Sequence, residues 1–411
     1  MDTQNLRDNY PKLIAYMEET GYCACYIKKI KREIIRIISE AASKDWTSYT
    51  DIYLEYAEKS NSPHYLRNKR TFLGIIEHFD VQDQYPDGHR HHKILKRGQY
   101  HFLSSEFKSV IDFYRMAERL RGKKETTIYC ESHSATSFLH AMQQSGADTF
   151  EKITEEAVLS VFMDIDNILH RSYTYMKNIA AVFKVCLPEA PATLGKILSY
   201  LPELRYIRKN IQYLKPAEIT RIKQALKNTE SGLSLRDRAV GTLALYTGLR
   251  CCDIAGLMIY DINWENEIIC IRQQKTDIPL ELPLSVIVGN AIHDYLATER
   301  PETDSEYVFI SENRPYGRLK SGSLSNISEK IMKAANIRQN TGERRGFHIF
   351  RHHLATELLS NGVPQPIISR AIGHTSPDSL ETYLSADFKH LKECALSIEQ
   401  FPMPKGVFGD A

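Results

Sequence analysis

The chain has 411 residues, of which 42% are hydrophobic and 25% charged, and its formal net charge is only +2. This length allows two or three domains that each bury a core, and the composition argues against a disordered or fibrous protein. Because no apolar segment is long enough to span a membrane and the N-terminus lacks an apolar signal segment, we expect a cytoplasmic protein without a membrane partner.

The first half of the chain is predicted to be helical. Apolar residues recur at three- and four-residue spacing in the segments 13–21, 26–42 and 65–79. A similar series follows about 100 residues further on, in the segments 110–122, 126–146 and 172–186. Two interpretations stay open: a duplicated small helical unit, or unrelated amphipathic helices. We expect one helical domain at 1–104 and a second at 105–205.

Two features of this half could suggest a metal site, and neither matches a usual one. The segment 88–101 is rich in His and basic residues but lacks a matching Cys or His group, which favours a basic linker close to DNA. Cys23 and Cys25 are separated by a single residue, which is not a usual metal-ligand spacing. We expect the eight cysteines to be reduced and mostly buried, and we expect no metal and no other cofactor.

From residue 217 to 390 the sequence predicts one mixed domain, joined to the helical part by a linker at 206–216. Pro216 is placed to begin a helix, and Gly248 to end one as a left-handed cap. Two half-buried strands are predicted at 267–275 and 279–284, and helices at 349–362, 366–373 and from Ser376 onward. The predicted fold class is therefore mainly α with a small β-sheet (α+β), preceded by one or two all-α domains.

Positive charge is concentrated in two places although the whole chain is nearly neutral. Between residues 313 and 345 there are eight Lys or Arg but only two Glu, and a shorter basic run lies near residue 208. A solvated basic face is the common explanation for one such run, but two runs around one domain favour a phosphate-backbone ligand. The candidate DNA-contacting residues are Arg205, Arg208, Lys209, Arg314, Arg318, Lys320, Arg344 and Arg345.

Chemistry is suggested by six side chains of the mixed domain taken together: Arg250, Lys275, His348, Arg351, His374 and Tyr383. Such a set suits phosphoryl transfer, because positively charged donors stabilise the negative charge that develops on phosphate oxygens. A tyrosine has a reference pKa of about 10 and needs a base or a positive neighbourhood to attack at neutral pH. Lys275 could donate a proton to the oxygen that leaves.

A zinc site is the alternative for the histidines of this domain. His348 and His352 stand four residues apart, which is the spacing of a helical zinc pair. No Glu follows the first of them and no third ligand is obvious, so the sequence favours a site without metal. We expect His352 and His353 to be supporting or surface residues.

These motifs resemble those of the tyrosine recombinases, the phage-type integrase family. The matching segments are TGLRCCDI, QQKTDIPLELPL, HIFRHHLAT, AIGH and ETY, in family order, at 247–254, 273–284, 348–356, 371–374 and 381–383. The resemblance implies that Arg250 and Arg351 are the catalytic arginines, that Lys275 is the hairpin lysine, and that His348 and His374 are the catalytic histidines. Tyr383 would be the nucleophile, and 105–205 the core-DNA-binding domain. Departures are mild, with Asp253, Phe350 and Ile372 at family positions that commonly hold Glu, Leu and Leu.

The same resemblance implies an activity and its partners. Tyr383 would attack a phosphate of double-stranded DNA, leaving a 3′-phosphotyrosyl link, and a 5′-hydroxyl of another strand would reverse the step. A homotetramer would act on two DNA sites, without ATP or metal, and an accessory DNA-bending or directionality protein could take part. Integration and excision of a mobile element and chromosome resolution both stay open as roles, and the extra N-terminal domain favours the mobile element. Whether a C-terminal tail at 391–411 packs on its own protomer or on a neighbour stays open.

Two other functions remain to be separated from this one. A type IB topoisomerase shares this chemistry but relaxes supercoils as a monomer. A non-catalytic DNA-binding protein could keep the fold, although the six intact positions argue against it.

Overall fold

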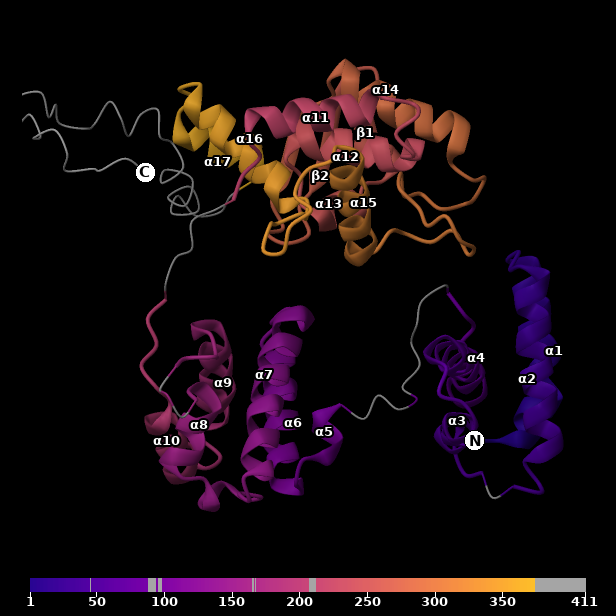
Figure 1. Cartoon of the computed structure of the whole chain (residues 1–411), viewed down its shortest axis with the longest axis vertical. Coiled ribbons are helices and arrows are strands. Elements are labelled where there is room, and N and C mark those ends of the chain that lie inside the picture. The colour runs from indigo at the N-terminus through magenta and orange to yellow at the C-terminus, as the bar shows by residue number, and fades with distance from the viewer. Residues whose placement is uncertain are drawn as a thin grey trace, which may run out of the picture. The chain divides into compact units, whose positions relative to one another are not determined.

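The computed structural model describes residues 1–44, 46–87, 94, 98–164, 166, 168–206 and 212–373 (Figure 1). Contacts divide them into two compact units. Unit 1 comprises Met1–Leu13, Lys28–Tyr85 and the described residues of 90–208, and unit 2 comprises Ile14–Ile27 and the described residues of 86–89 and 209–411. The predicted fold class is confirmed, because the described residues form many helices and one three-stranded sheet.

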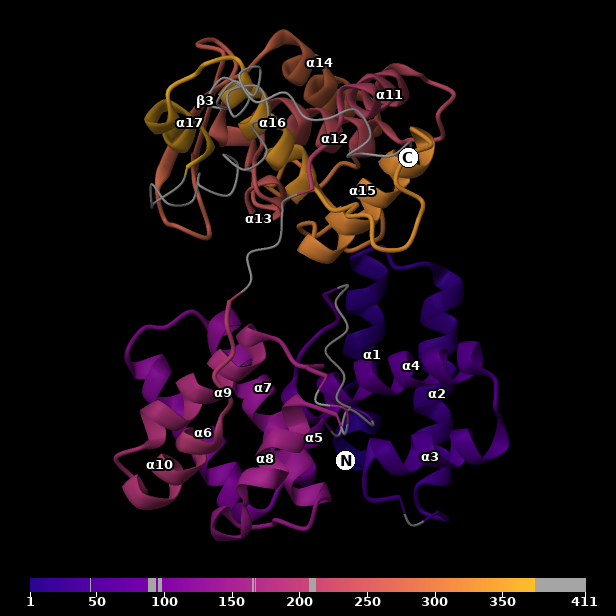
Figure 2. The same cartoon turned by 60° about the vertical axis from the view of Figure 1, so that its left-hand side comes forward.

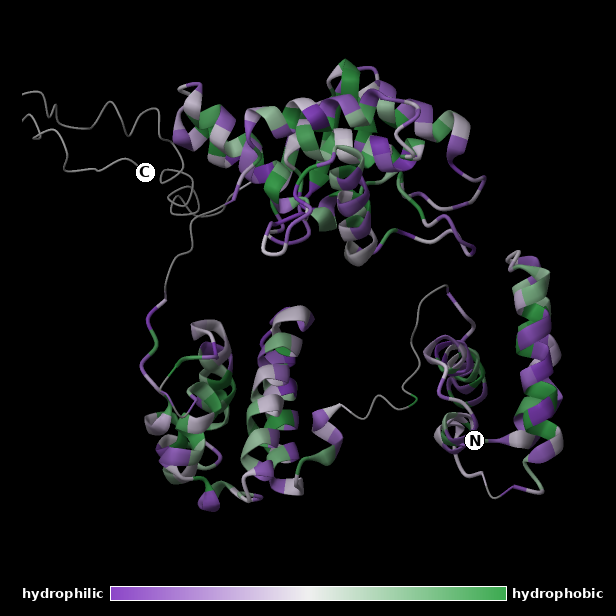
Figure 3. Cartoon of the chain, viewed as in Figure 1, coloured by the Kyte–Doolittle hydropathy of each residue, from purple (hydrophilic) through white to green (hydrophobic). Residues whose placement is uncertain are grey.

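The N-terminal helices are α1 (Thr3–Glu19), α2 (Ala24–Glu40), α3 (Tyr49–Lys59) and α4 (Pro63–Gln82). Three of them correspond to the predicted amphipathic segments, whereas α3 was not predicted. Figure 3 shows apolar and polar residues interleaved along these helices, as burial of one side requires. The sequence pattern thus identified the long helices and missed a short one.

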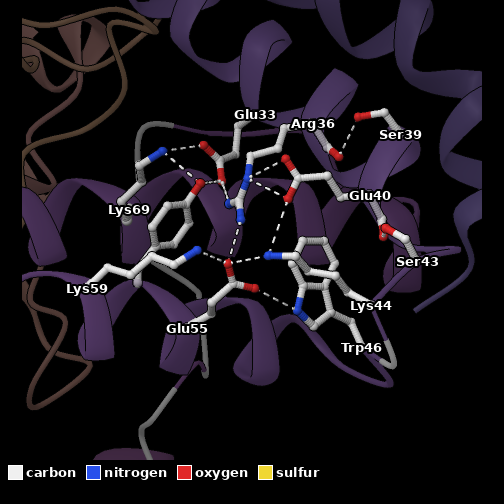
Figure 4. A network of polar contacts seen from close by, with 11 residues as sticks. Glu33, Arg36, Ser39, Glu40, Ser43, Lys44, Trp46, Glu55, Lys59 and Lys69 are labelled. Carbon is white, nitrogen blue, oxygen red and sulfur yellow. Dashed lines mark hydrogen bonds and ion pairs between the residues drawn. The ribbon is translucent and has the colours of Figure 1, made fainter.

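A network of charged side chains ties α2 to α3 (Figure 4). Arg36 lies between Glu40, at 3.2 Å, and Glu55, at 3.3 Å. Hydrogen bonds from Lys44 and Lys59 lower the pKa of the Glu55 carboxyl to about 2. Charges of opposite sign therefore compensate one another across these helices.

The following helical group has a core of its own. Its elements are α5 (Gln99–Phe102), α6 (Ser105–Leu120), α7 (Glu125–Gln144), η1 (Phe150–Lys152), α8 (Glu155–Phe162), α9 (Tyr173–Cys186) and α10 (Pro191–Tyr200). Phe107, Phe138 and Phe183 are fully buried in the cluster that joins α6, α7 and α9. The three expected helical segments correspond to α6, α7 and α9, whereas the shorter elements were not predicted. The predicted domain boundaries at 104, 205 and 390 stay predictions.

The mixed part lies in unit 2. Its elements are α11 (Pro216–Lys227), α12 (Leu235–Thr247), α13 (Cys251–Ala255), η2 (Ile259–Asp261), β1 (Ile262–Asn263), β2 (Ile268–Arg272), β3 (Pro279–Pro283), α14 (Val286–Asp294), η3 (Tyr295–Glu299), α15 (Ser321–Ala334), α16 (His348–Ser360) and α17 (Gln365–Ile372). Pro216 does begin a helix, and Gly248 ends α12 in the left-handed region at φ 60°. Both predictions are confirmed.

The sheet is antiparallel, in the order β1-β2-β3. Ile269 pairs with Leu282, and Ile271 pairs with Leu280, and all four side chains are buried. The residues between them face away, as the alternation of a half-buried strand requires. The two predicted strands are confirmed as β2 and β3, and the two-residue strand β1 is an addition.

Helix α17 brings the C-terminal end of the described chain to the sheet. It contacts both α16 and β3 (Figure 2). Gly373 ends α17 with φ 65°, and a Cβ atom there would lie 2.3 Å from Nε2 of Gln273. Glycine is therefore required twice at this position, for its backbone angle and for its lack of a side chain.

No helix of the described part is long and apolar enough to cross a membrane. The predicted Ser376 cap and the tail at 391–411 lie outside the described residues, as does most of the His-rich segment 88–101.

Candidate active site

Arg250 lies at the junction between two helices, where its backbone is held on both sides. Gly248 ends α12, and Arg250 directly precedes α13 with an extended backbone. Its Nη1 donates to Oε1 of Gln273 at 2.7 Å, and its Nη2 donates to the carbonyl of Gly373 at 3.1 Å. The guanidinium is thus held between Gln273, which directly follows β2, and the end of α17, so that its donors have a fixed orientation.

Arg351 approaches the same place from the first turn of α16. Its residue is only 4% exposed, which is unusual for a charged side chain. Nη1 donates to the carbonyl of Gly248 at 3.0 Å, and Nη2 donates to the carbonyl of Ile372 at 2.6 Å. The two predicted catalytic arginines therefore bind successive carbonyls at the end of α17, which brings two positive groups to one helix end.

Gln273 connects these parts and was not predicted as a site residue. It is fully buried, accepts from Arg250 and from Oγ1 of Thr276 at 2.8 Å, and donates to the carbonyl of Ile372 at 3.4 Å. The signal was present in the sequence, since Gln273 continues the buried positions Ile269 and Ile271 at spacing two. A glutamine at a buried strand position needs polar partners, and here those partners belong to the site.

Lys275 lies in the turn that follows β2, and its side chain is exposed. The carboxylate of Asp253 holds this turn by accepting the Gln274 N–H at 2.9 Å. Arg318 reaches the turn as well, donating to Oε1 of Gln274 at 2.9 Å and to the Ala255 carbonyl at 3.0 Å. The lysine is thus carried on a turn whose backbone is anchored to α13.

The electrostatics of His348 show that the predicted cations gather around it. The pKa of its imidazole is lowered first by partial desolvation of the ring, and then by the positive charges of Arg351, Lys275, Arg250 and Arg344. Four of the six predicted catalytic residues are therefore close enough to influence one another. A neutral imidazole at this position can accept a proton, which is what a general base requires.

His352 stacks on His348 with ring centroids 6.4 Å apart. Desolvation, followed by the charges of His348, Arg344 and Arg351, lowers the pKa of His352 from 6.5 to about 4. The folded state thus favours the neutral ring. Above pH 6.5 the ring is neutral in the folded and unfolded states alike, so its protonation does not reduce the free energy of unfolding there. As pH falls from 6.5 towards about 4, the unfolded chain takes up a proton that the folded chain does not, so stability is lost.

We expect the variant His352→Gln to lose less stability than the wild type between pH 7 and pH 4.5, since it lacks this protonation. Urea unfolding at the two pH values measures the difference directly. His293→Gln, at an exposed position of α14, is the matched control and should follow the wild type. Equal acid losses in wild type and His352→Gln would contradict the prediction.

The side chains predicted to contact DNA differ in exposure and in whether they already donate hydrogen bonds within the protein. Arg318 and Arg345 donate into the protein, Arg345 through a 2.8 Å bond to the Gln339 carbonyl. Arg205, Arg314 and Lys320 are exposed, as is Arg344. Within the described ranges, the side chains of Lys320 and Arg344 make no hydrogen bond or ion pair.

Several predicted residues cannot be placed. Arg208, Lys209, His374 and Tyr383 lie outside the described residues. Among the residues that the structure does describe, no group of three His, Cys, Asp or Glu could hold a metal ion, and His353 instead contacts Glu357 at 3.2 Å.

Comparison with known proteins gives a consistent result for the C-terminal half. Residues 212–390 match the model of the family described as the phage integrase family. The protein y4gC of Sinorhizobium fredii, whose name describes it as an integrase or recombinase, is 35% identical over 185 residues, which are 45% of this chain and 94% of that protein. Tyrosine recombinase XerA of Pyrococcus furiosus is 30% identical over 39% of this chain and 53% of its own length.

Other similarities extend into the helical part. Tyrosine recombinase XerC of Listeria monocytogenes is 28% identical over 288 residues, covering 68% of this chain and 92% of that protein. The crystal structure of the XerH site-specific recombinase bound to difH substrate, a pre-cleavage complex, superposes with a TM-score of 0.50 and 18% identity over 71% of this chain and 96% of that one. This structural likeness bears on the fold alone.

Proposed function

Because the chain belongs to the phage integrase family of tyrosine recombinases, we propose that it cuts and rejoins double-stranded DNA at specific sites through a covalent 3′-phosphotyrosyl intermediate. Its enzyme class is that of the tyrosine-type site-specific recombinases. The observation that carries the proposal is the pair of guanidiniums at one helix end. Arg250 and Arg351 bind adjacent carbonyls of Gly373 and Ile372, so both can approach one phosphate near this point.

In the proposed cleavage step, the phenolic oxygen of Tyr383 attacks the phosphorus and forms the new P–O bond. The bond to the 5′-oxygen breaks, and that oxygen takes a proton from Lys275. Arg250 and Arg351 stabilise the additional negative charge on the non-bridging oxygens, which is the main task in phosphoryl transfer. His348 accepts the phenol proton, and His374 donates a hydrogen bond to the phosphate.

Rejoining reverses these steps with a 5′-hydroxyl from another strand. The P–O bond to Tyr383 conserves the energy of the phosphodiester, so the proposal requires no ATP and no metal. Exchange between two duplexes needs four strand cleavages, and one tyrosine per protomer then requires four protomers. We therefore include a homotetramer on two DNA sites in the proposal.

The remaining parts are assigned by the chemistry of their surfaces. Lys320 and Arg344 are exposed within a basic region and suit phosphate contacts, with Arg205, Arg208, Lys209 and Arg314 as further contacts. Arg318 and Arg345 would support this surface from within, because they donate to backbone carbonyls. The helical group with its own core at 105–205 would be the core-DNA-binding domain. We further propose that the recombinase integrates a mobile element and acts in the cytoplasm. An accessory DNA-bending or directionality protein would assist it.

A nicked suicide substrate tests this function directly. Once cleaved, such DNA loses the short strand that would reverse the reaction, so the covalent adduct accumulates. We expect the wild type to form an adduct that withstands denaturation, Tyr383→Phe to form none, and Tyr260→Phe, which removes an exposed phenol elsewhere, to match the wild type. DNA binding without any wild-type adduct would indicate a non-catalytic binder, and supercoil relaxation without recombinant product would indicate a topoisomerase.

A further inference from the structure

Two exposed thiols lie in contact at the start of α2. The Sγ atoms of Cys23 and Cys25 are 2.9 Å apart, and both residues are exposed. We propose that these cysteines form a reversible intrachain disulfide, so that the chain carries a dithiol reactive toward small-molecule disulfides. The proposed function assigns no role to this pair, and the inference stands independently of it.

The local backbone explains how residues with one residue between them come into contact. Within a helix, side chains two positions apart point in different directions. Cys23 precedes the helix, however, and its carbonyl accepts the N–H groups of Tyr26 at 2.8 Å and Ile27 at 3.0 Å. A residue in this capping position turns its side chain back over the first helical turn, which is where Cys25 lies.

The position also favours the reactive form of a thiol. A disulfide is attacked by a thiolate, and the N-terminal end of a helix carries partial positive charge that stabilises an anion. Helix α2 has 17 residues, and Lys28 and Lys29 follow within its first two turns. Exposure to solvent gives a small-molecule disulfide access to both sulfur atoms.

The other described cysteines lack this combination. Burial raises the pKa of the Cys186 thiol to about 12, and burial is also the main cause that raises the pKa of Cys251 and of Cys252. Cys130 and Cys270 are exposed, but within the described part of the chain no second thiol lies in hydrogen-bond contact with either. Cys23 and Cys25 are thus distinguished by exposure together with proximity.

The reaction is balanced with oxidised glutathione as the oxidant. One cysteine thiolate attacks a sulfur of glutathione disulfide, forms a mixed disulfide and releases one glutathione. The second cysteine thiolate then attacks the Sγ atom of the first cysteine in this mixed disulfide, which forms the intrachain disulfide and releases the other glutathione. The protein loses two hydrogens in total, and one glutathione disulfide is reduced to two glutathione thiols.

The sequence offers a clean measurement, because trypsin cleavage after Lys12 and Lys28 leaves both cysteines, and no other, in the peptide Leu13–Lys28. The full chain is incubated with oxidised glutathione, remaining thiols are alkylated, and the digest is analysed by mass spectrometry. We expect this peptide to become two hydrogens lighter and to escape alkylation, and to return to the dithiol after reduction. A Leu13–Lys28 peptide that stays alkylated at both positions, or that keeps glutathione, would overturn the proposal.

Single variants identify the resolving step. In Cys23→Ser and in Cys25→Ser the remaining thiol has no partner for the second attack, so each should retain one glutathione. Cys130→Ser is the matched control at another exposed cysteine and should leave the oxidation of Leu13–Lys28 unchanged. Loss of glutathione from either single variant at the wild-type rate would also overturn the assignment.

Discussion

Arg351→Lys should reduce DNA cleavage by about a hundredfold to a thousandfold, the range found when one donor to a developing oxyanion is removed. The substitution keeps the positive charge, but a lysine cannot donate to the carbonyls of Gly248 and Ile372 from two separate nitrogens in a fixed plane. The measurement is single-turnover cleavage of the nicked substrate at saturating enzyme, so that weaker DNA binding does not enter the rate.

Loss of stability must be separated from loss of chemistry, because Arg351 is buried and each carbonyl left without a donor costs roughly 1–3 kcal/mol. Arg338→Lys is a suitable control. Arg338 is also largely buried, donating to Glu218 at 2.8 Å and to the Tyr213 carbonyl at 2.7 Å. We expect both variants to unfold at lower urea concentration, while Arg338→Lys keeps its cleavage rate. Cleavage by Arg351→Lys within tenfold of wild type would refute its proposed role.

Gly373→Ala should have the second large effect. An alanine in the left-handed region costs about 1–2 kcal/mol. In addition, its Cβ would lie 2.3 Å from Nε2 and 2.4 Å from Oε1 of Gln273, so either the glutamine or the end of α17 must shift. Since Arg250, Arg351 and Gln273 all bind carbonyls at this end, we expect cleavage to fall by more than tenfold.

A comparison with Gly362→Ala separates the contact with Gln273 from the backbone penalty. Gly362 follows α16 with φ 74°, and nothing lies within 4 Å of a Cβ built there. This control therefore carries the backbone penalty alone, and it should lower stability modestly without impairing cleavage. If Gly373→Ala and Gly362→Ala lose stability and cleavage equally, the contact with Gln273 has no consequence.

The parts of this protein that could be predicted are those fixed by short-range patterns. The alternation around Ile269 and Leu280 indicated the strands, and the single glycine Gly248 indicated a helix end, because each depends on a few neighbouring residues. The arrangement of Arg250 with Arg351 was implied by family motifs. Periodicity alone could not have shown it, since the two residues lie 101 positions apart and are brought together by tertiary contacts, among them those to the carbonyls of Ile372 and Gly373 at the end of α17.

What escaped prediction depends on tertiary contacts. The strand alternation could have indicated that Gln273 is buried, but only the fold shows that its partners are Arg250 and the carbonyl of Ile372. Arg318 was expected to contact DNA, but its sequence surroundings could not reveal that Ala255 and Cys252 supply carbonyls to it. The charge of a residue is visible in the sequence, whereas its partners become visible only when distant segments meet.

The shared end of α17 has a consequence for how the site responds to change. Three side chains take their acceptors from two consecutive carbonyls, those of Ile372 and Gly373. A displacement of this helix end would loosen all three at once, so their contributions are thermodynamically coupled rather than independent. The two arginines would therefore be expected to gain or lose their orientation together, as one cooperative unit whose state is set by the position of a single helix.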